Sequence, residues 1–342
     1  MRKPLLVHPW NQSIQKQYRK MTATTTYKNP RDKLRQRQKS HILALILSGC
    51  TIILLAAGAL VTSTGSSLAV PDWPLAYGEV FPPMVGGILY EHGHRMIATL
   101  VGFITVILAG WLWWAEDRKW VKWLGLGALF LVILQGVMGG ITVLYLLPKT
   151  ISVTHALLAQ LFFLTTVGIA QITADSWPAF VEMGRRNANQ KLGRSGIWAS
   201  LTLGMYIIVL LIGATMRHNN AGLAIPDFPL AYGGLIPPLS SFPLVIHFAH
   251  RVSAVLLVIL VAGTVVTTLK DHKDKGALTS LSWALVGIVT VQFLLGGTVI
   301  WTKLSVPITT LHLVNGALLF GTTGLLLLRM ITLAGISSKK RS

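Results

Sequence analysis

Charged side chains are scarce in this chain. Only 12% of its 342 residues are Asp, Glu, Lys or Arg, and only 11 are acidic. A soluble domain of this length carries about twice that charged fraction, so the composition argues against a soluble globular protein. Hydrophobic residues make up 52% of the chain and gather in long uncharged runs. These runs predict a polytopic membrane protein.

Cysteine is almost absent, because Cys50 is the only one. A disulfide within the chain is therefore impossible, and a metal cluster held by thiolates is strongly disfavoured. Cys50 lies inside an apolar run, where we interpret it as a small buried apolar residue.

Eight apolar runs are long enough to cross about 30 Å of hydrocarbon as helices. They cover residues 41–63, 91–114, 121–146, 151–173, 196–216, 243–269, 279–301 and 308–333. We therefore expect an all-α membrane protein with eight transmembrane helices. The long Pro- and Gly-rich loops 64–90 and 217–242 would cap the helices on the outer side.

The net charge of +19 could indicate nucleic-acid binding, but its distribution argues against a nucleic-acid partner. Residues 1–40 hold eleven Lys and Arg, and most others lie in loops or a tail on the same side of the membrane. This asymmetry predicts cytoplasmic N and C termini and favours a bacterial inner (plasma) membrane over a mitochondrial one. We interpret the basic N-terminal tail as an arm facing anionic membrane lipid; a mitochondrial transit peptide is the alternative.

The chain contains an internal repeat. LVTSTGSSLAVPDWPLAYG at 60–78 is matched by TMRHNNAGLAIPDFPLAYG at 215–233. Each repeat holds four spans, so both halves have the same orientation in the membrane. We predict two pseudo-symmetric four-helix bundles. The predicted segments are a basic cytoplasmic tail (1–40), a first bundle (41–173), a basic cytoplasmic linker (174–195), a second bundle (196–333) and a basic tail (334–342).

Four histidines occupy matching places in the two halves. His94 and His250 are 156 residues apart, and His155 and His312 are 157 apart. The topology places all four in the first two turns of helices that enter from the outer side. Two histidines on facing helices of each bundle predict two bis-histidine haem sites. The alternative is four hydrogen-bonded residues that pack helices together. Zinc fits less well, because each bundle supplies only two histidines.

Glu91 distinguishes the two halves. It lies three residues before His94, on the same helix face, whereas His247 fills this position in the second half. A carboxylate beside a haem could accept protons or stabilise positive charge on a substrate. The alternative is a carboxylate that pairs with the helix dipole.

Cations and glycines accompany the histidines. Arg95, Arg251 and Lys303 lie at the outer edge, where they would pair with haem propionates or simply extend to water. The pairs Gly139–Gly140 and Gly296–Gly297 would allow close approach of a ring, although ordinary helix packing explains them equally well.

Together these motifs resemble the haem A synthase family. The E-x-x-H-R string at 91–95, His155, His250–Arg251, His312 and the paired P-D-[WF]-P-L-A-Y-G loops carry the resemblance, which covers nearly all of 41–333. It implies oxidation of the C8 methyl of haem O to a formyl group, giving haem A for cytochrome oxidase.

The resemblance also implies roles for residues. Haem b would be the cofactor on His250 and His312, with Arg251 and Lys303 beside it. Haem O would be the substrate between His94 and His155, near Arg95, and all four histidines would be axial ligands of haem iron. Glu91 would be the catalytic residue. A farnesyl-transferring haem O synthase would supply the substrate, and an electron acceptor that the sequence does not identify would complete the oxidation.

One departure concerns the first outer loop. Many bacterial members have a cysteine pair there, and we place Val70 and Ala76 at those positions. The chain therefore resembles a cysteine-free branch, in which no thiol step can operate. Two other functions stay open: a non-catalytic dihaem b-type protein for membrane electron transfer or haem handling, and a transporter built from parallel repeats. The carboxylate in only one half argues for the enzyme.

Overall fold

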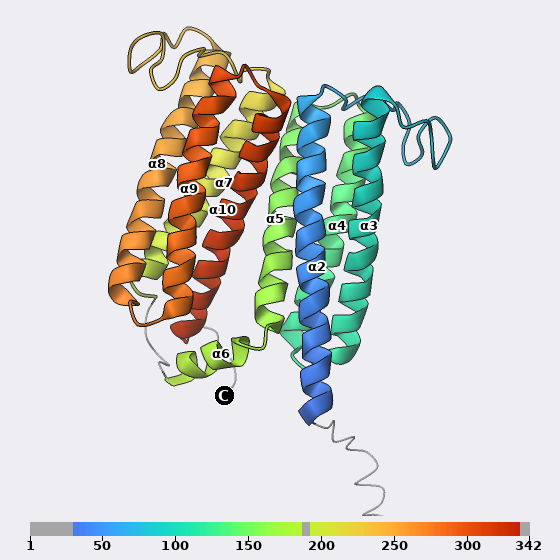
Figure 1. The fold of residues 1–342 in the computed structure, drawn as a ribbon. Helices are drawn as coiled ribbons and strands as arrows, with labels where there is room; N and C mark the ends of the chain where they lie inside the picture. The colour runs from blue at the N-terminus through green and yellow to red at the C-terminus, as the bar shows by residue number, and fades with distance from the viewer. Residues whose placement is uncertain (1–29, 187–191, 336–342) are drawn as a thin grey trace, which may run out of the picture.

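The computed structural model describes residues 30–186 and 192–335, and helices dominate this part of the chain (Figure 1). The helices are α2 (Pro30–Ser63), α3 (Gly86–Ala115), α4 (Lys119–Leu144), α5 (Lys149–Thr173), α6 (Trp177–Arg186), α7 (Arg194–His218), α8 (Phe242–Asp271), α9 (Gly276–Trp301) and α10 (Val306–Leu333). All except α6 are long and apolar enough to cross a membrane. The prediction of an all-α protein with eight transmembrane helices is confirmed.

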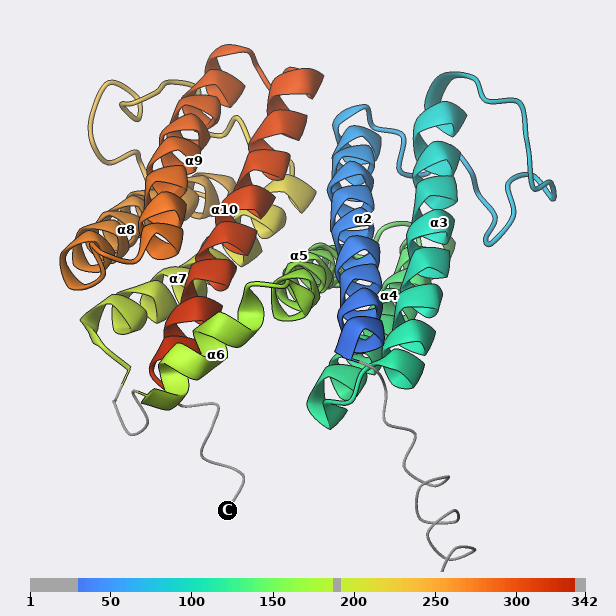
Figure 2. The ribbon, with the colours of Figure 1, turned by 60° about the horizontal axis from the view of Figure 1, so that its bottom comes forward.

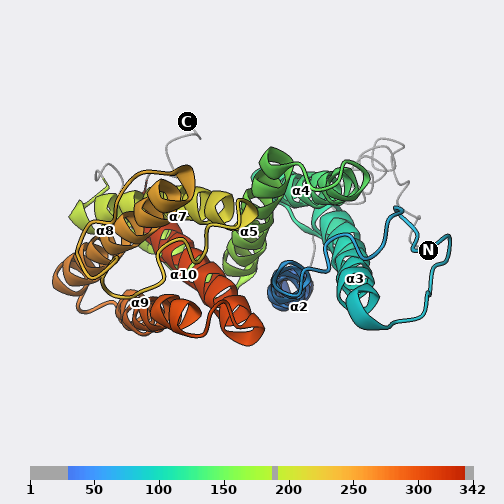
Figure 3. The same ribbon diagram turned by 90° about the horizontal axis from the view of Figure 1, so that it is seen from above.

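The long helices form two groups of four, α2–α5 and α7–α10, which stand side by side (Figures 1 and 3). Between the groups, α10 packs against α2 and α5, and α5 also packs against α7. Both long loops lie at the end of the molecule opposite α6 (Figure 1). The groups are therefore joined along their length, and the loops share one surface.

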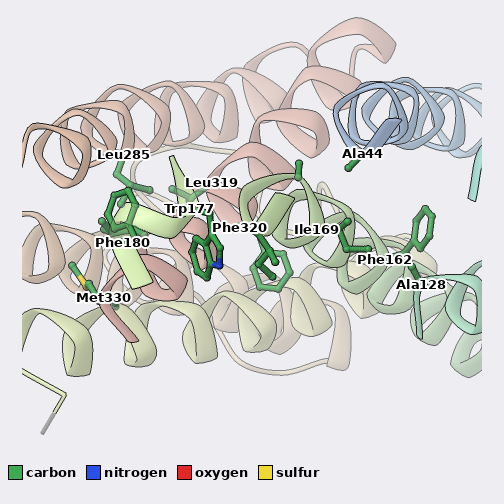
Figure 4. Close-up of a cluster of buried hydrophobic side chains, with 14 of the residues drawn as sticks. Ala44, Ala128, Phe162, Ile169, Trp177, Phe180, Leu285, Leu319, Phe320 and Met330 are labelled. Carbon is green, nitrogen blue, oxygen red and sulfur yellow. The ribbon is translucent and has the colours of Figure 1, made fainter. Parts of the chain in front are cut away.

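Close helix packing joins the two groups. Phe162 and Ile169 of α5 and Phe320 of α10 belong to one buried apolar cluster that reaches from one group to the other (Figure 4). A Cβ atom on Gly321 of α10 would lie 2.9 Å from Cε1 of Phe163 on α5. Small residues that let helices approach are a common basis of packing in membranes, where lipid is as apolar as the helix surface.

Two helix starts differ from the sequence expectation by more than three residues. The first helix begins at Pro30 rather than near 41, and α3 begins at Gly86 rather than 91. Hydropathy marks only the apolar part of a helix, whereas the polar residues at 30–40 continue the first helix. Residues 86–90 were assigned to the preceding loop because that loop is rich in Pro and Gly, but the helix already includes Gly86 and Gly87. Residues 1–29 of the basic tail lie outside the described part of the chain.

Helix α6 lies within 174–195, where we expected only a basic linker. Its Trp177 and Phe180 are buried, and Gly184 contacts the carbonyl oxygen of Thr332 at the end of α10. The guanidinium of Arg329 lies 5.3 Å from the ring centre of Phe180. Helix α6 thus runs beneath the second group (Figure 2), and its apolar spacing of three and seven residues was the signal that could have revealed it.

Candidate functional site

Each of the four histidines packs against a glycine on a neighbouring helix. A Cβ atom on Gly58 of α2 would lie 3.1 Å from Cε1 of His94, and one on Gly213 of α7 would lie 2.9 Å from Cε1 of His250. The corresponding distances are 3.7 Å for Gly139 with His155 and 3.5 Å for Gly296 with His312. The same packing therefore recurs four times. A Cβ atom would crowd the imidazole ring at Gly58 and Gly213, whereas it would make ordinary contact at Gly139 and Gly296.

The histidines form one pair in each group of helices. His94 and His155 lie close enough to interact electrostatically, as do His250 and His312. Nδ1 of His155 is buried without a hydrogen-bond partner, although such atoms are normally paired, and the rings of His94 and His250 lie near the backbone of Leu54 and Val209 on the neighbouring helices. Among the described residues, no three His, Cys, Asp or Glu side chains gather as metal ligands. Two imidazoles per group, with spare ring nitrogens, suit a haem better than a zinc ion.

Glu91 is buried, with 4% of its surface exposed, and both of its carboxylate oxygens are bonded. Oε1 accepts a hydrogen bond of 2.7 Å from Arg95, and Oε2 accepts one of 2.9 Å from the backbone N–H of Val70. The same Arg95 donates to the carbonyl oxygens of Asp72 and Leu75. Glu91 and Arg95 therefore fasten the first outer loop to the start of α3, next to His94.

The second half repeats this arrangement with a histidine in place of the glutamate. The backbone N–H of Ile225 lies 3.2 Å from Nδ1 of His247, and Nε of Arg251 lies 3.2 Å from Nε2. Arg251 also donates to the carbonyl oxygens of Asp227 and Leu230. A neutral imidazole has only one acceptor nitrogen, so His247 satisfies one of these donors where the carboxylate of Glu91 satisfies two.

The two arginines for which the sequence left haem propionates and water as alternatives donate hydrogen bonds to the loops. Arg95 and Arg251 each donate to at least three backbone carbonyl oxygens. Lys303 lies in the exposed turn between α9 and α10, and its proposed role at a propionate stays a prediction. Arg217, at the end of α7, donates a hydrogen bond of 2.7 Å to Oγ of Ser63 on α2, which links the two groups at their outer end.

Each outer loop contains an aspartate that organises a tight turn. The backbone N–H groups of Gly78 and Tyr77 donate to the Asp72 carboxylate and lower the pKa of that side chain. Asp227 makes the same bonds with Gly233 and Tyr232. Hydrogen bonds to the ionised form favour it, so both turns are stabilised by a charged aspartate. The sequence signal was an Asp placed five residues before Tyr-Gly in both loops.

An aromatic side chain from each loop packs on the second glycine of a pair. Trp73 lies over Gly140, and Phe228 lies over Gly297; a Cβ atom on either glycine would be 2.8 Å from the ring. The first glycine of each pair faces a histidine, as described above. The first glycine of each pair thus packs against a histidine of the next helix, and the second seats a loop side chain, which neither alternative had included. Close approach of a haem ring stays a prediction.

Comparison with known proteins agrees with this architecture. Residues 84–323 match a family model described as cytochrome oxidase assembly protein. The haem A synthase of Halalkalibacterium halodurans is 31% identical, over 79% of this chain and 90% of its own length. That of Symbiobacterium thermophilum is 33% identical, over 71% of this chain and 80% of its own length. The chain belongs to the haem A synthase family of cytochrome oxidase assembly proteins.

Proposed function

We propose that this protein converts haem O to haem A by oxidising the ring methyl at C8 to a formyl group. The observation that carries the proposal is the difference between two otherwise matching sites: the loop beside His94 is fastened by the carboxylate of Glu91, and the loop beside His250 by the imidazole of His247. We assign haem O as substrate to His94 and His155. We assign haem b as cofactor to His250 and His312.

In this proposal the two groups of helices have different tasks. Bound haem b supplies one-electron redox chemistry, whose potential the protein tunes through ligands and their surroundings. The α2–α5 group binds and orients the substrate. Trp73, although partly exposed, lies over Gly140 next to Gly139 and anchors the loop at that end of the group.

In this proposal Glu91 supplies a carboxylate beside the substrate site. Its carboxylate accepts hydrogen bonds from Arg95 and from the backbone N–H of Val70, which hold the side chain in place. A carboxylate fixed in this way beside the substrate can stabilise positive charge that develops during the oxidation, because a preorganised group needs no rearrangement during the reaction.

The cellular setting follows from the same proposal. We place the protein in a bacterial inner membrane with both termini in the cytoplasm, because the basic loops lie on that side. A haem O synthase supplies the substrate, and a separate electron acceptor removes electrons from haem b.

The test is to express the protein in cells that make haem O, purify it in detergent, and identify its extracted porphyrins by chromatography with mass detection. We expect haem b together with haem A or a hydroxylated intermediate. Two equivalents of haem b, with haem O available and no modified porphyrin, would instead establish the dihaem electron carrier.

The glycines that face the histidines provide a further prediction. Gly213→Ala should push the His250 ring away from its position. Overpacking of this kind costs about 1–3 kcal/mol, and each ~1.4 kcal/mol is tenfold in binding. Haem b affinity, measured by titrating the apoprotein with haem b, should therefore fall about tenfold. The matched control is Gly204→Ala on the same helix, where a Cβ atom meets nothing within 4 Å. Equal affinities of the two variants would show that this packing does not position His250.

A further inference from the structure

The second histidine of each pair has different surroundings in the two halves. Gln135 of α4 and Gln292 of α9 occupy equivalent places in LQGVMGG and VQFLLGG. In the first half, Nε2 of Gln135 donates a hydrogen bond of 2.9 Å to the backbone carbonyl of His155. In the second half, Nε2 of Gln292 lies 3.3 Å from both ring nitrogens of His312. The same residue type thus contacts the backbone in one half and the imidazole in the other.

Asn315 accounts for this difference. Its Nδ2 donates a hydrogen bond of 2.8 Å to Oε1 of Gln292 and one of 3.0 Å to the carbonyl of Ile288. With Oε1 occupied, the Gln292 amide presents its N–H groups to the face of the His312 ring, because its Nε2 is equally far from the two ring nitrogens. The residue equivalent to Asn315 in the first half is Leu158, three positions after His155. A leucine cannot donate a hydrogen bond, so the Gln135 amide has no such constraint.

We propose that Gln292 and Asn315 are positioning residues that fix His312 and raise the reduction potential of the haem on His250 and His312. The inference rests on the proposed function, which places haem b there. The amide N–H groups carry partial positive charge beside the imidazole. This charge disfavours the ferric state, which has one more positive charge than the ferrous state, so it raises the potential.

This difference between the halves sets the direction of electron transfer between the two haem sites. Without the asparagine, the site at His94 and His155 lacks the same amide orientation. The haem of the second half is therefore the better electron acceptor of the two. Electrons removed in the first half then pass to the second half in the energetically favourable direction.

The test is a redox titration of the purified, haem-loaded protein, followed by the absorbance of reduced haem b. Asn315→Leu gives the second half the residue of the first and frees the Gln292 amide to turn. At the potential where the unaltered protein is half reduced, the ratio of ferrous to ferric haem b should fall about fivefold, the effect of one net hydrogen bond. Gln292→Glu, which replaces the donor by an acceptor of the same shape, should lower the ratio further.

Controls separate this inference from the proposed function. Leu158→Asn makes the reverse exchange in the first half and should leave the titration of haem b unchanged. If Asn315→Leu does not retain haem, Asn315→Ala removes the same donor without adding a charge and should give the same fall. An unchanged titration of Asn315→Leu or Asn315→Ala, together with an unchanged Gln292→Glu, would overturn the inference. Retention of haem b in His312→Ala would instead overturn the haem assignment on which the inference rests.

Discussion

Replacing Glu91 by glutamine should reduce conversion of haem O to haem A by about 100-fold or more, while haem b stays bound. Glu91 is the only carboxylate buried among the described residues, so no neighbouring acid can take over its charge. The amide of glutamine has nearly the same shape but no negative charge. The measurement is the yield of haem A per bound haem b in extracts of cells that make haem O.

The chain itself offers a variant that separates charge from structure. Glu91→His places in the first half the residue that the second half has at His247, where an imidazole lies against the corresponding backbone N–H and arginine. The outer loop should therefore keep its place, but the carboxylate is lost. We expect Glu91→His to bind haem b normally and to make no haem A. Normal haem A production by this variant would show that Glu91 only holds the outer loop in place and has no catalytic role.

Alanine substitutions of the four histidines should divide them into two classes. His250→Ala or His312→Ala should lower bound haem b more than about tenfold, because each removes an axial ligand. His94→Ala or His155→Ala should keep haem b at the normal level and abolish haem A production. The measurements are haem b per chain, from the spectrum of the purified protein, and extracted haem A.

A histidine outside the pairs provides the control. His41 lies near the other end of α2, and its Nδ1 is 2.8 Å from the carbonyl of Ala170. His41→Ala should change neither haem b nor haem A. The assignment of the two sites would be reversed if loss of His94 or His155 removed haem b while loss of His250 or His312 left it bound.

The transmembrane part of the fold could be predicted because lipid imposes a simple rule. Every backbone polar group must be bonded within its own helix, so long apolar runs must be helices. This rule does not predict helix α6, because its ten residues are not a long apolar run. It is held by Trp177 and Phe180 packing under α10, and its only sequence signal was its apolar spacing, which is far weaker than a long apolar run. The start of α2 at Pro30 was missed because polar residues carry no membrane signal.

The candidate site was predictable only in part. The repeat identified the four histidines and the contrast of Glu91 with His247, because both are visible as aligned residues. It could not show that Arg95 donates to loop carbonyls, since hydrogen-bond partners 20 or more residues apart depend on the folded loop. Gln292 and Asn315 were missed for a similar reason. The role of an amide in an apolar helix can be recognised only when its partner on the next helix is known, and the sequence does not show that partner.

The way the outer loops are fastened has a consequence for how such proteins diversify. Arg95 and Glu91 bind main-chain atoms of the loop, including the N–H of Val70 and the carbonyl of Leu75. The backbone of Ala76 likewise pairs with that of Glu79. Every residue type except proline offers these atoms. Mutations can therefore exchange loop side chains without removing these bonds, provided that at the fully buried Val70 and Ala76 the new side chain fits the available volume, and selection can explore new loop chemistries.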